Sequence, residues 1–266
     1  MTKGLRESYS DLEDESEFPD NYETLNELKS PLSVLHYNLL FHFQDKYPAK
    51  FHPDFVRDMI KLYSRENDLI WDGCSGSGVV VREALKLGRR ALGTDVNPKA
   101  IDLSKRHAEE KGYLNADYRV ADARVYKLEE KADLIISSLP FGLNIIGDKN
   151  HYSENENDIS NSKSYLDFFK ESEKIIKNYF DNLKPNGIMI LDARDRSKDG
   201  EFFYLIFEFY NAAIKIGFER LARYYYELIP YRQMTSKDKD TGFVRPMPAT
   251  MDVIVMKKPT NEKLFN

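Results

Sequence analysis

The stretch Leu69-Ile70-Trp71-Asp72-Gly73-Cys74-Ser75-Gly76-Ser77-Gly78 decides the fold of this chain. Its apolar residues stand together without alternation, which indicates a short strand buried on both faces. The glycines that follow let the backbone turn sharply and approach a ligand closely. Helical spacing of apolar residues then resumes over 79–87. A strand, a glycine turn and a helix in this order are typical of the first unit of a nucleotide-binding α/β fold.

A second strand, predicted within 90–96, strengthens this interpretation. It ends in Asp95, roughly 20 residues after the glycine turn, which is the spacing at which a carboxylate reaches ribose hydroxyls. The turn lacks the Gly-Lys-Ser/Thr ending of a P-loop. Asp72 at its front would repel a pyrophosphate and would suit a cationic ligand. The two strands therefore predict a ribose-containing ligand that carries positive charge.

These two stretches, 72–78 and 93–98, resemble the first two cofactor motifs of class I methyltransferases. The resemblance implies S-adenosylmethionine, with its ammonium and sulfonium groups, as the cofactor. It implies an α/β, Rossmann-like fold whose seven-stranded sheet is mostly parallel and has an antiparallel last strand. The cofactor-binding residues expected from it are Phe51, Asp72, Gly73, Cys74, Gly76, Gly78, Asp95, Val96, Asp122 and Ala123.

Three of these residues, Phe51, Asp122 and Ala123, come from other segments. Tyr47-Pro48-Ala49-Lys50-Phe51-His52-Pro53 resembles a segment that contacts the cofactor in amino-methylating DNA methyltransferases. Asp122 ends a third predicted strand, where an acid accepts the adenine amino group in the resembled families. A surface acid at a strand end is the alternative for Asp122. The histidines of 31–53 do not have the spacing of metal ligands, and no metal is expected.

The motif Ser138-Leu139-Pro140-Phe141 follows a predicted fourth strand and points to the chemistry. It resembles the Asp/Asn/Ser-Pro-Pro-Tyr/Phe motif of methyltransferases that act on exocyclic amines of bases, with Leu139 in place of the first proline. The hydroxyl of Ser138 and the carbonyl of Leu139 would accept hydrogen bonds from the amine, and Phe141 would stack on the extruded base. The alternative is that 139–141 closes the strand end against the core. Methylation at cytosine C5 would need a cysteine nucleophile, and Cys74 lies in the cofactor turn instead.

The rest of the chain reads as one α/β domain. Further helices are predicted over 54–63, 98–112, 165–183 and 202–216, a turn over 183–187, and later strands over 188–191, 218–229 and 250–256. Residues 1–30 hold nine acids and three bases and are expected to form a flexible tail. The net charge of the whole chain is −5, so this tail accounts for it and the rest of the chain is nearly neutral. Residues 31–266 are expected to form a single methyltransferase domain with inserted loops over 143–162 and 230–249.

Composition narrows the class of protein. Hydrophobic residues make up 41% of the 266 residues, enough for a core, and no apolar run approaches the roughly 20 residues of a membrane span. The N-terminus has no apolar signal segment, and a single cysteine excludes an internal disulfide. A cytoplasmic enzyme that does not bind membranes is expected.

The expected substrate is nucleic acid, with cytosine N4 in structured RNA such as ribosomal RNA placed first. The near-neutral catalytic core and the absence of a domain-sized target-recognition segment favour RNA, whereas the 47–53 resemblance favours DNA. DNA N4-cytosine or N6-adenine methylation and RNA guanine-N2 methylation remain alternatives, as does a small-molecule or protein substrate. Asn144, Arg232 and Arg245 are candidate substrate-binding residues in the two loops, where cations and aromatic residues suit phosphates and unstacked bases. Oligomeric state is not predicted.

Overall fold

The computed structural model describes residues 33–38, 51–141, 153–198, 201–229 and 249–260. The helices in this part of the chain are α2 (Pro53–Tyr63), α3 (Val79–Lys86), α4 (Pro98–Glu110), α6 (Tyr165–Asn182), α7 (Leu205–Ile216) and the 3-10 turn η3 (Ile159–Asn161). The strands are β1 (Ser33–Asn38), β2 (Leu69–Asp72), β3 (Arg90–Asp95), β4 (Asp117–Val120), β5 (Ala132–Ser138), β6 (Leu183–Ala193), β7 (Arg196–Lys198), β8 (Glu201–Phe203), β9 (Glu219–Ile229) and β10 (Ala249–Lys257). None of the helices described is long and apolar enough to cross a membrane.

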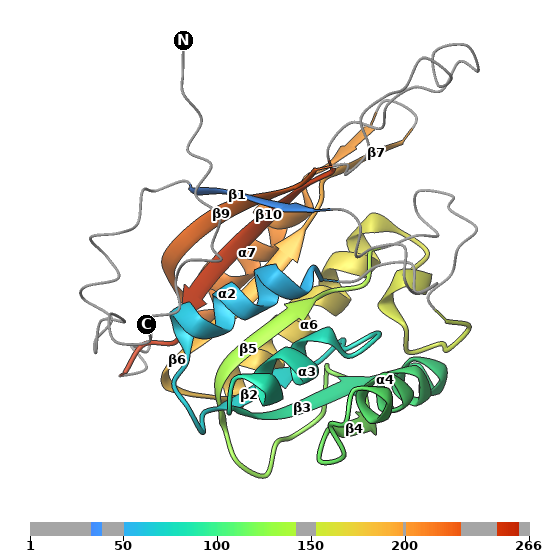
Figure 1. Cartoon of the computed structure of the whole chain (residues 1–266). Helices are drawn as coiled ribbons and strands as arrows, with labels where there is room; N and C mark the ends of the chain where they lie inside the picture. The colour runs from blue at the N-terminus through green and yellow to red at the C-terminus, as the bar shows by residue number, and fades with distance from the viewer. Residues whose placement is uncertain (1–32, 39–50, 142–152, 199–200, 230–248, 261–266) are drawn as a thin grey trace, which may run out of the picture.

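One twisted sheet runs through the molecule, with strand order β1-β9-β10-β6-β5-β2-β3-β4 (Figure 1). Strand β10 pairs antiparallel with both β6 and β9, and the other described pairs of this sheet are parallel. The predicted α/β fold, with seven mostly parallel strands and an antiparallel last strand, is confirmed. Strand β1, which sequence analysis did not predict, adds an eighth strand at the β9 edge.

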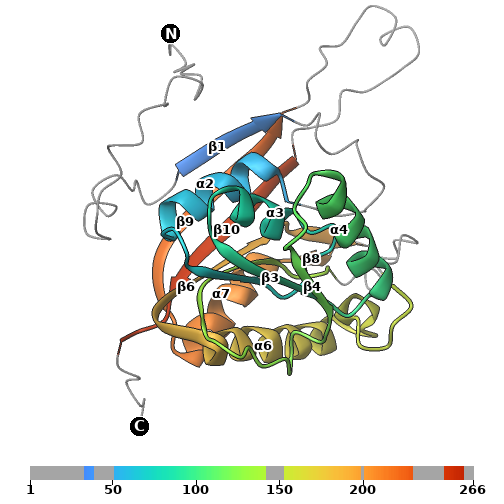
Figure 2. The ribbon, with the colours of Figure 1, turned by 60° about the horizontal axis from the view of Figure 1, so that its bottom comes forward.

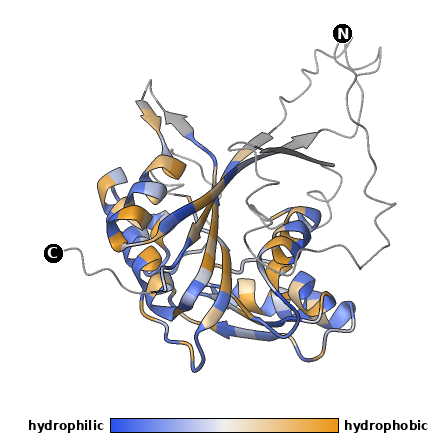
Figure 3. Cartoon of the chain, turned by 90° about the vertical axis from the view of Figure 1, so that its left-hand side faces the viewer, coloured by the Kyte–Doolittle hydropathy of each residue, from blue (hydrophilic) through white to orange (hydrophobic). Residues whose placement is uncertain are grey.

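Helices cover both faces of the sheet (Figure 2). Helices α2 and α3 pack on one face, where Phe55, Met59 and Val80 join Ile70 and Leu134 of the strands in one apolar cluster. Helices α6 and α7 pack on the other face in a second cluster, which contains Trp71. Figure 3 colours apolar residues orange, and these residues lie along the strands and on the helices that pack against them. The central strands are buried on both sides, as their unbroken apolar runs predicted.

The parallel arrangement places the site. Strands β2, β3, β4, β5 and β6 run in the same direction, so their carboxyl ends meet at one edge of the sheet. Ligands of open α/β sheets bind at this edge. The glycine turn, Asp95 and the 138–141 motif all follow these strand ends, which brings together segments that lie up to about 70 residues apart in the chain.

Some boundaries differ from the predictions. Helix α7 begins at Leu205 rather than at 202, because Phe202 and Phe203 belong to β8, which pairs with β7. The predicted turn over 183–187 is part of β6, where the register with β5 shifts and Asn186 adopts φ 64°. The pairing with β5 skips from Leu183 to Ile188, so residues 184–187 form an irregularity within β6 where the sequence predicted a turn. The acidic tail 1–30 lies outside the described residues, as do residues 143–152 of the first predicted loop and 230–248 of the second.

Candidate active site

The glycine turn between β2 and α3 is fixed from the side by β3. The N–H of Ser75 donates to the carbonyl of Thr94 at 2.9 Å, and the N–H of Gly76 donates to the carboxylate of Asp95 at 2.9 Å. Gly76 and Gly78 adopt φ of 50° and 77°, which glycine reaches at no steric cost. Hydrogen bonds to β3 and the positive φ of two glycines therefore hold the turn in this conformation.

Asp72 is a buried carboxylate at the bottom of the turn. Its Oδ1 accepts from the N–H of Cys74 at 3.1 Å and from the hydroxyl of Ser137 at 3.0 Å. Burial raises the pKa of Asp72 to about 8; these hydrogen bonds oppose the shift, and the nearby Asp95 and Asp192 add to it. Within the described chain Asp72 has no ion-pair partner. A buried carboxylate of this kind favours a cationic ligand, which would offset the cost of its charge.

Asp95 ends β3 and is 8% exposed. Its two oxygens accept from the N–H groups of Gly76 and Asn97, each at 2.9 Å. Burial raises the pKa of Asp95 to about 6, and these two hydrogen bonds oppose the shift. A carboxylate has about four lone-pair sites, so two remain for ligand hydroxyls. This geometry suits the ribose role that the spacing predicted.

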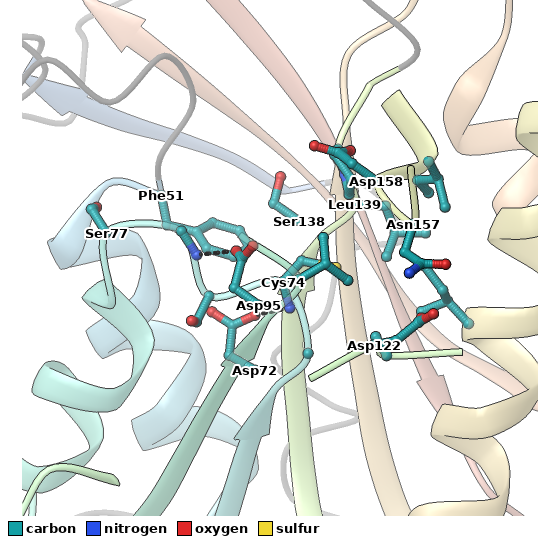
Figure 4. Close-up of a pocket in the computed structure, with 18 of the residues that line it drawn as sticks. Phe51, Asp72, Cys74, Ser77, Asp95, Asp122, Ser138, Leu139, Asn157 and Asp158 are labelled. Carbon is teal, nitrogen blue, oxygen red and sulfur yellow. Dashed lines mark hydrogen bonds between the residues drawn. The ribbon is translucent and has the colours of Figure 1, made fainter. Parts of the chain in front are cut away.

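A cavity at the carboxyl edge brings the predicted residues together (Figure 4). Of the residues predicted to bind cofactor or to act in catalysis, those that line it are Phe51, Asp72, Gly73, Cys74, Gly76, Asp95, Val96, Asp122, Ala123, Ser138, Leu139 and Pro140. Gly78 is absent from the lining because it precedes α3, where the hydroxyl of Tyr118 donates to its carbonyl at 2.9 Å. Residues 72–76, 95–96, 122–123 and 138–140 therefore share one site.

Asp122 lies just past β4 and forms an ion pair with Arg124. The guanidinium of Arg124 donates to both of its carboxylate oxygens at 2.7 to 3.0 Å. The same guanidinium also reaches Glu171 and Asn157. Asp122 lines the cavity, but Arg124 takes part of its capacity to accept hydrogen bonds. The adenine role of Asp122 stays a prediction.

Residues 138–140 of the 138–141 motif line the cavity, whereas Phe141 packs in the apolar core. Ser138 is half-buried and lines the cavity at the end of β5, and no hydrogen bond joins its hydroxyl to another described residue. Phe141 is 5% exposed, packs in the apolar cluster of α6 and α7, and does not line the cavity. Stacking of Phe141 on a base would require its ring to leave this core, so that role also stays a prediction.

Seven residues of the cavity wall were not predicted from the sequence, and three of them, Ser75, Ser77 and Val79, belong to the glycine turn and the start of α3. The other four come from more distant segments. Asn157, Asp158 and Ile159 lie in the segment before α6, and Ile175 lies on α6 itself. The length of 143–162 and its place just past the 138–141 motif predicted a functional or mobile loop without selecting these positions. The side chain of Asn155 donates to the carbonyl of Val96 at 2.8 Å and ties the segment to the rim of the site.

The remaining predictions concern the substrate-binding residues, the Cys74 thiol and metal binding. Asn144, Arg232 and Arg245 lie outside the described residues, so their substrate roles stay predictions. Burial raises the pKa of the Cys74 thiol well above its ordinary value, which disfavours a nucleophilic thiolate. In the described ranges, no group of three His, Cys, Asp or Glu side chains could hold a metal ion.

Two family models match the chain. The model described as "Methyltransferase domain" matches residues 65–220, which cover the glycine turn, Asp95, Asp122 and the 138–141 motif. The model described as "DNA methylase" matches residues 5–106 and ends after the first two cofactor motifs.

Two curated relatives are methyltransferases by name, and one solved structure has a similar fold. The chain is 29% identical over 98 residues to a tRNA (guanine(10)-N2)-dimethyltransferase of Methanothermobacter thermautotrophicus, covering 36% of this chain and 29% of that protein. It is 31% identical over 135 residues to a ubiquinone biosynthesis O-methyltransferase of Pelagibacter ubique, covering 50% and 45%. The matches thus span less than half the length of either relative. TrmN from Thermus thermophilus superposes with a TM-score of 0.54 at 16% identity, over 79% of this chain and 50% of that one, and shows the same fold.

Proposed function

The chain belongs to the methyltransferase domain family, and we propose that it methylates the exocyclic amine of a base in RNA. The cofactor is S-adenosylmethionine, which supplies an electrophilic methyl group on a sulfonium. The cavity fits it, because Asp72, a buried carboxylate with no ion-pair partner among the described residues, suits a cation, and Asp95 suits ribose hydroxyls. The observation that carries the proposal is that 138–140 lines this same cavity.

The proposed role of the motif follows from the chemistry of the amine. The lone pair of a base amine is delocalised into the ring, which makes it a poor nucleophile. The hydroxyl of Ser138 and the carbonyl of Leu139 accept hydrogen bonds from its two N–H groups and favour a tetrahedral nitrogen. The nitrogen then forms its bond to the methyl carbon as the carbon–sulfur bond breaks, and the methylated amine loses a proton to water. Positioning of the amine supplies much of the acceleration.

We place cytosine N4 first, because serine in the first position of this motif is typical of cytosine-N4 enzymes. Guanine N2 in RNA is the second candidate, supported by the similarity to the archaeal tRNA (guanine(10)-N2)-dimethyltransferase. That similarity also favours RNA over DNA, whereas the DNA methylase model favours DNA. Both amines present two N–H groups to the same pair of acceptors, so the geometry of the motif serves either base.

The test is transfer of an isotope-labelled methyl group. Purified protein is incubated with labelled S-adenosylmethionine and, separately, with total RNA, genomic DNA and free nucleosides, and each digest is analysed by mass spectrometry. We expect labelled N4-methylcytidine in RNA, and labelled N2-methylguanosine would select the second candidate. Label confined to DNA would replace RNA by DNA as the substrate. Cofactor binding without label in any nucleic acid would refute the proposed substrate class.

A further inference from the structure

A buried tyrosine from the far side of the sheet reaches the floor of the cofactor site. Tyr179 of α6 is fully buried, and its hydroxyl donates to the hydroxyl of Ser137 at 2.9 Å. Ser137, also fully buried on β5, donates to Oδ1 of Asp72 at 3.0 Å. Three residues from α6, β5 and β2 therefore form one hydrogen-bonded line that ends at the carboxylate facing the cavity.

The direction of the line is set by chemistry. When Asp72 is ionised, as it would be beside a cation, it accepts hydrogen bonds and donates none, so the Ser137 hydroxyl donates a hydrogen bond to it. The oxygen of Ser137 is then an acceptor, and Tyr179 must donate to it. Burial raises the pKa of the Tyr179 hydroxyl well above its ordinary value, so it stays a donor. Among the described residues both donors to Asp72 engage Oδ1, which leaves Oδ2 for a ligand.

The glycine turn is shaped to accept this tyrosine. A Cβ at Gly73 would overlap the hydroxyl and ring of Tyr179, so a larger residue at 73 would displace one of them. Trp71 packs edge-on against the Tyr179 ring with centroids 5.0 Å apart. On the opposite side, the Trp71 indole donates to the hydroxyl of Thr94, which donates to the carbonyl of Gly73. The position of Tyr179 is therefore fixed by the same turn that carries Asp72.

We propose that Tyr179 and Ser137 are positioning residues that orient the Asp72 carboxylate and favour its ionised form for the cationic part of the cofactor. This inference rests on the proposed cofactor role of Asp72. Within the described part of the chain, the other titratable groups that act on Asp72 are Asp95 from β3, Asp192 from β6, Cys74 from the turn and Tyr118 from β4, and none of these is a cation. In their place, two aligned hydroxyl dipoles favour the carboxylate charge.

The experiment measures S-adenosylmethionine binding by calorimetry from about pH 6 to about pH 9. Tyr179→Phe removes the terminal donor and keeps the ring. We expect the dissociation constant to rise roughly three- to tenfold, the usual net value of one hydrogen bond. Because the ionised form of Asp72 loses support, its pKa rises further, and the loss of affinity on acidification should begin roughly half to one pH unit higher. Ser137→Ala should shift the profile in the same direction, and the double variant should add little.

Tyr126→Phe is the matched control. Tyr126 also packs on Trp71, with centroids 6.0 Å apart, but its hydroxyl accepts from Arg119 and does not reach Asp72. Its binding profile should match that of the unsubstituted protein. Suppose that the unsubstituted protein binds the cofactor and that Tyr179→Phe and Ser137→Ala leave the pH profile unchanged. This result would overturn the positioning role of Tyr179 and Ser137 and leave the proposed function standing. A lowered melting temperature without a shifted pH profile would also overturn it, because packing alone would explain that result. Unsubstituted protein that does not bind the cofactor at all would refute the cofactor site itself.

Discussion

The two halves of the cavity are held in different ways. In the cofactor half, made of residues 72–77 and 95, each carboxylate is fixed by two hydrogen bonds and is at most 8% exposed. In the target half, made of residues 138–140, Ser138 is half-buried and its hydroxyl bonds to no other described residue. A ligand that is the same in every cycle suits a rigid site, whereas a macromolecular target that enters and leaves suits open hydrogen-bonding groups. The difference predicts that substitutions in the cofactor half change binding and those in the target half change turnover.

The largest effect is expected at Phe141, which borders the target half but packs in the core. Phe141→Ala would create a cavity and lower the free energy of unfolding by about 3–5 kcal/mol, the usual cost of this truncation. The melting temperature should therefore fall by about ten degrees. Melting temperature and methyl transfer are measured on the same preparation. A variant that melts normally and has lost activity would show that the ring leaves the core to stack on the target, and the comparison would then need revision.

Asp72→Asn tests the cofactor half. We expect S-adenosylmethionine affinity to fall roughly hundredfold, because hydrogen bonds to a charged partner contribute about 1.5–3 kcal/mol each. Calorimetric titration checks this loss, with the conservative Asp54→Asn on the exposed side of α2 as control. Unchanged affinity in the Asp72 variant would remove Asp72 from the cofactor site.

The same variant should stabilise the protein without ligand. The folded state holds the Asp72 proton up to about pH 8, whereas the unfolded state releases it near the ordinary value of 3.8. Between these values the folded state binds more protons, so its free energy of unfolding falls as pH rises. Asp72→Asn carries no such proton and should melt several degrees higher than the unsubstituted protein near pH 8. A variant that melts lower than the unsubstituted protein at this pH would contradict the cost assigned to the buried charge.

Ser138→Ala tests the target half and should have the smallest effect. Loss of one hydrogen bond to the amine should lower turnover roughly tenfold while cofactor affinity stays constant. Ser172→Ala on α6 is the matched control, because the Ser172 hydroxyl bonds to the carbonyl of Phe168 in its own helix. A Ser138 variant that loses cofactor affinity in proportion to its turnover would place Ser138 in the cofactor half.

The sequence predicted the elements of the cofactor half closely. The strand before Asp72, the glycine turn, the helix after it and the strand ending in Asp95 all lie where the apolar periodicity indicated them. The reason is that these contacts are short in the chain: Gly76 and Asp95 bond across 19 residues. Glycines, strand ends and acids at fixed spacing are visible in a single sequence because one βαβ unit imposes that spacing.

Only the tertiary structure shows which residues distant in the sequence reach Asp72 and the cavity. Tyr179 lies 105 residues after Cys74, and only the packing of α6 on the sheet brings its hydroxyl under Asp72. An apolar helical face marks Tyr179 as buried but does not state what it meets. Asn157, Asp158 and Ile159 reach the cavity because their segment is tied to Val96, and Phe141 faces the core because α6 and α7 close over it. Local spacing in the sequence therefore predicted the first βαβ unit and its two carboxylates, Asp72 and Asp95, whereas long-range packing decided which side chains orient Asp72 and which groups form the rest of the cavity wall.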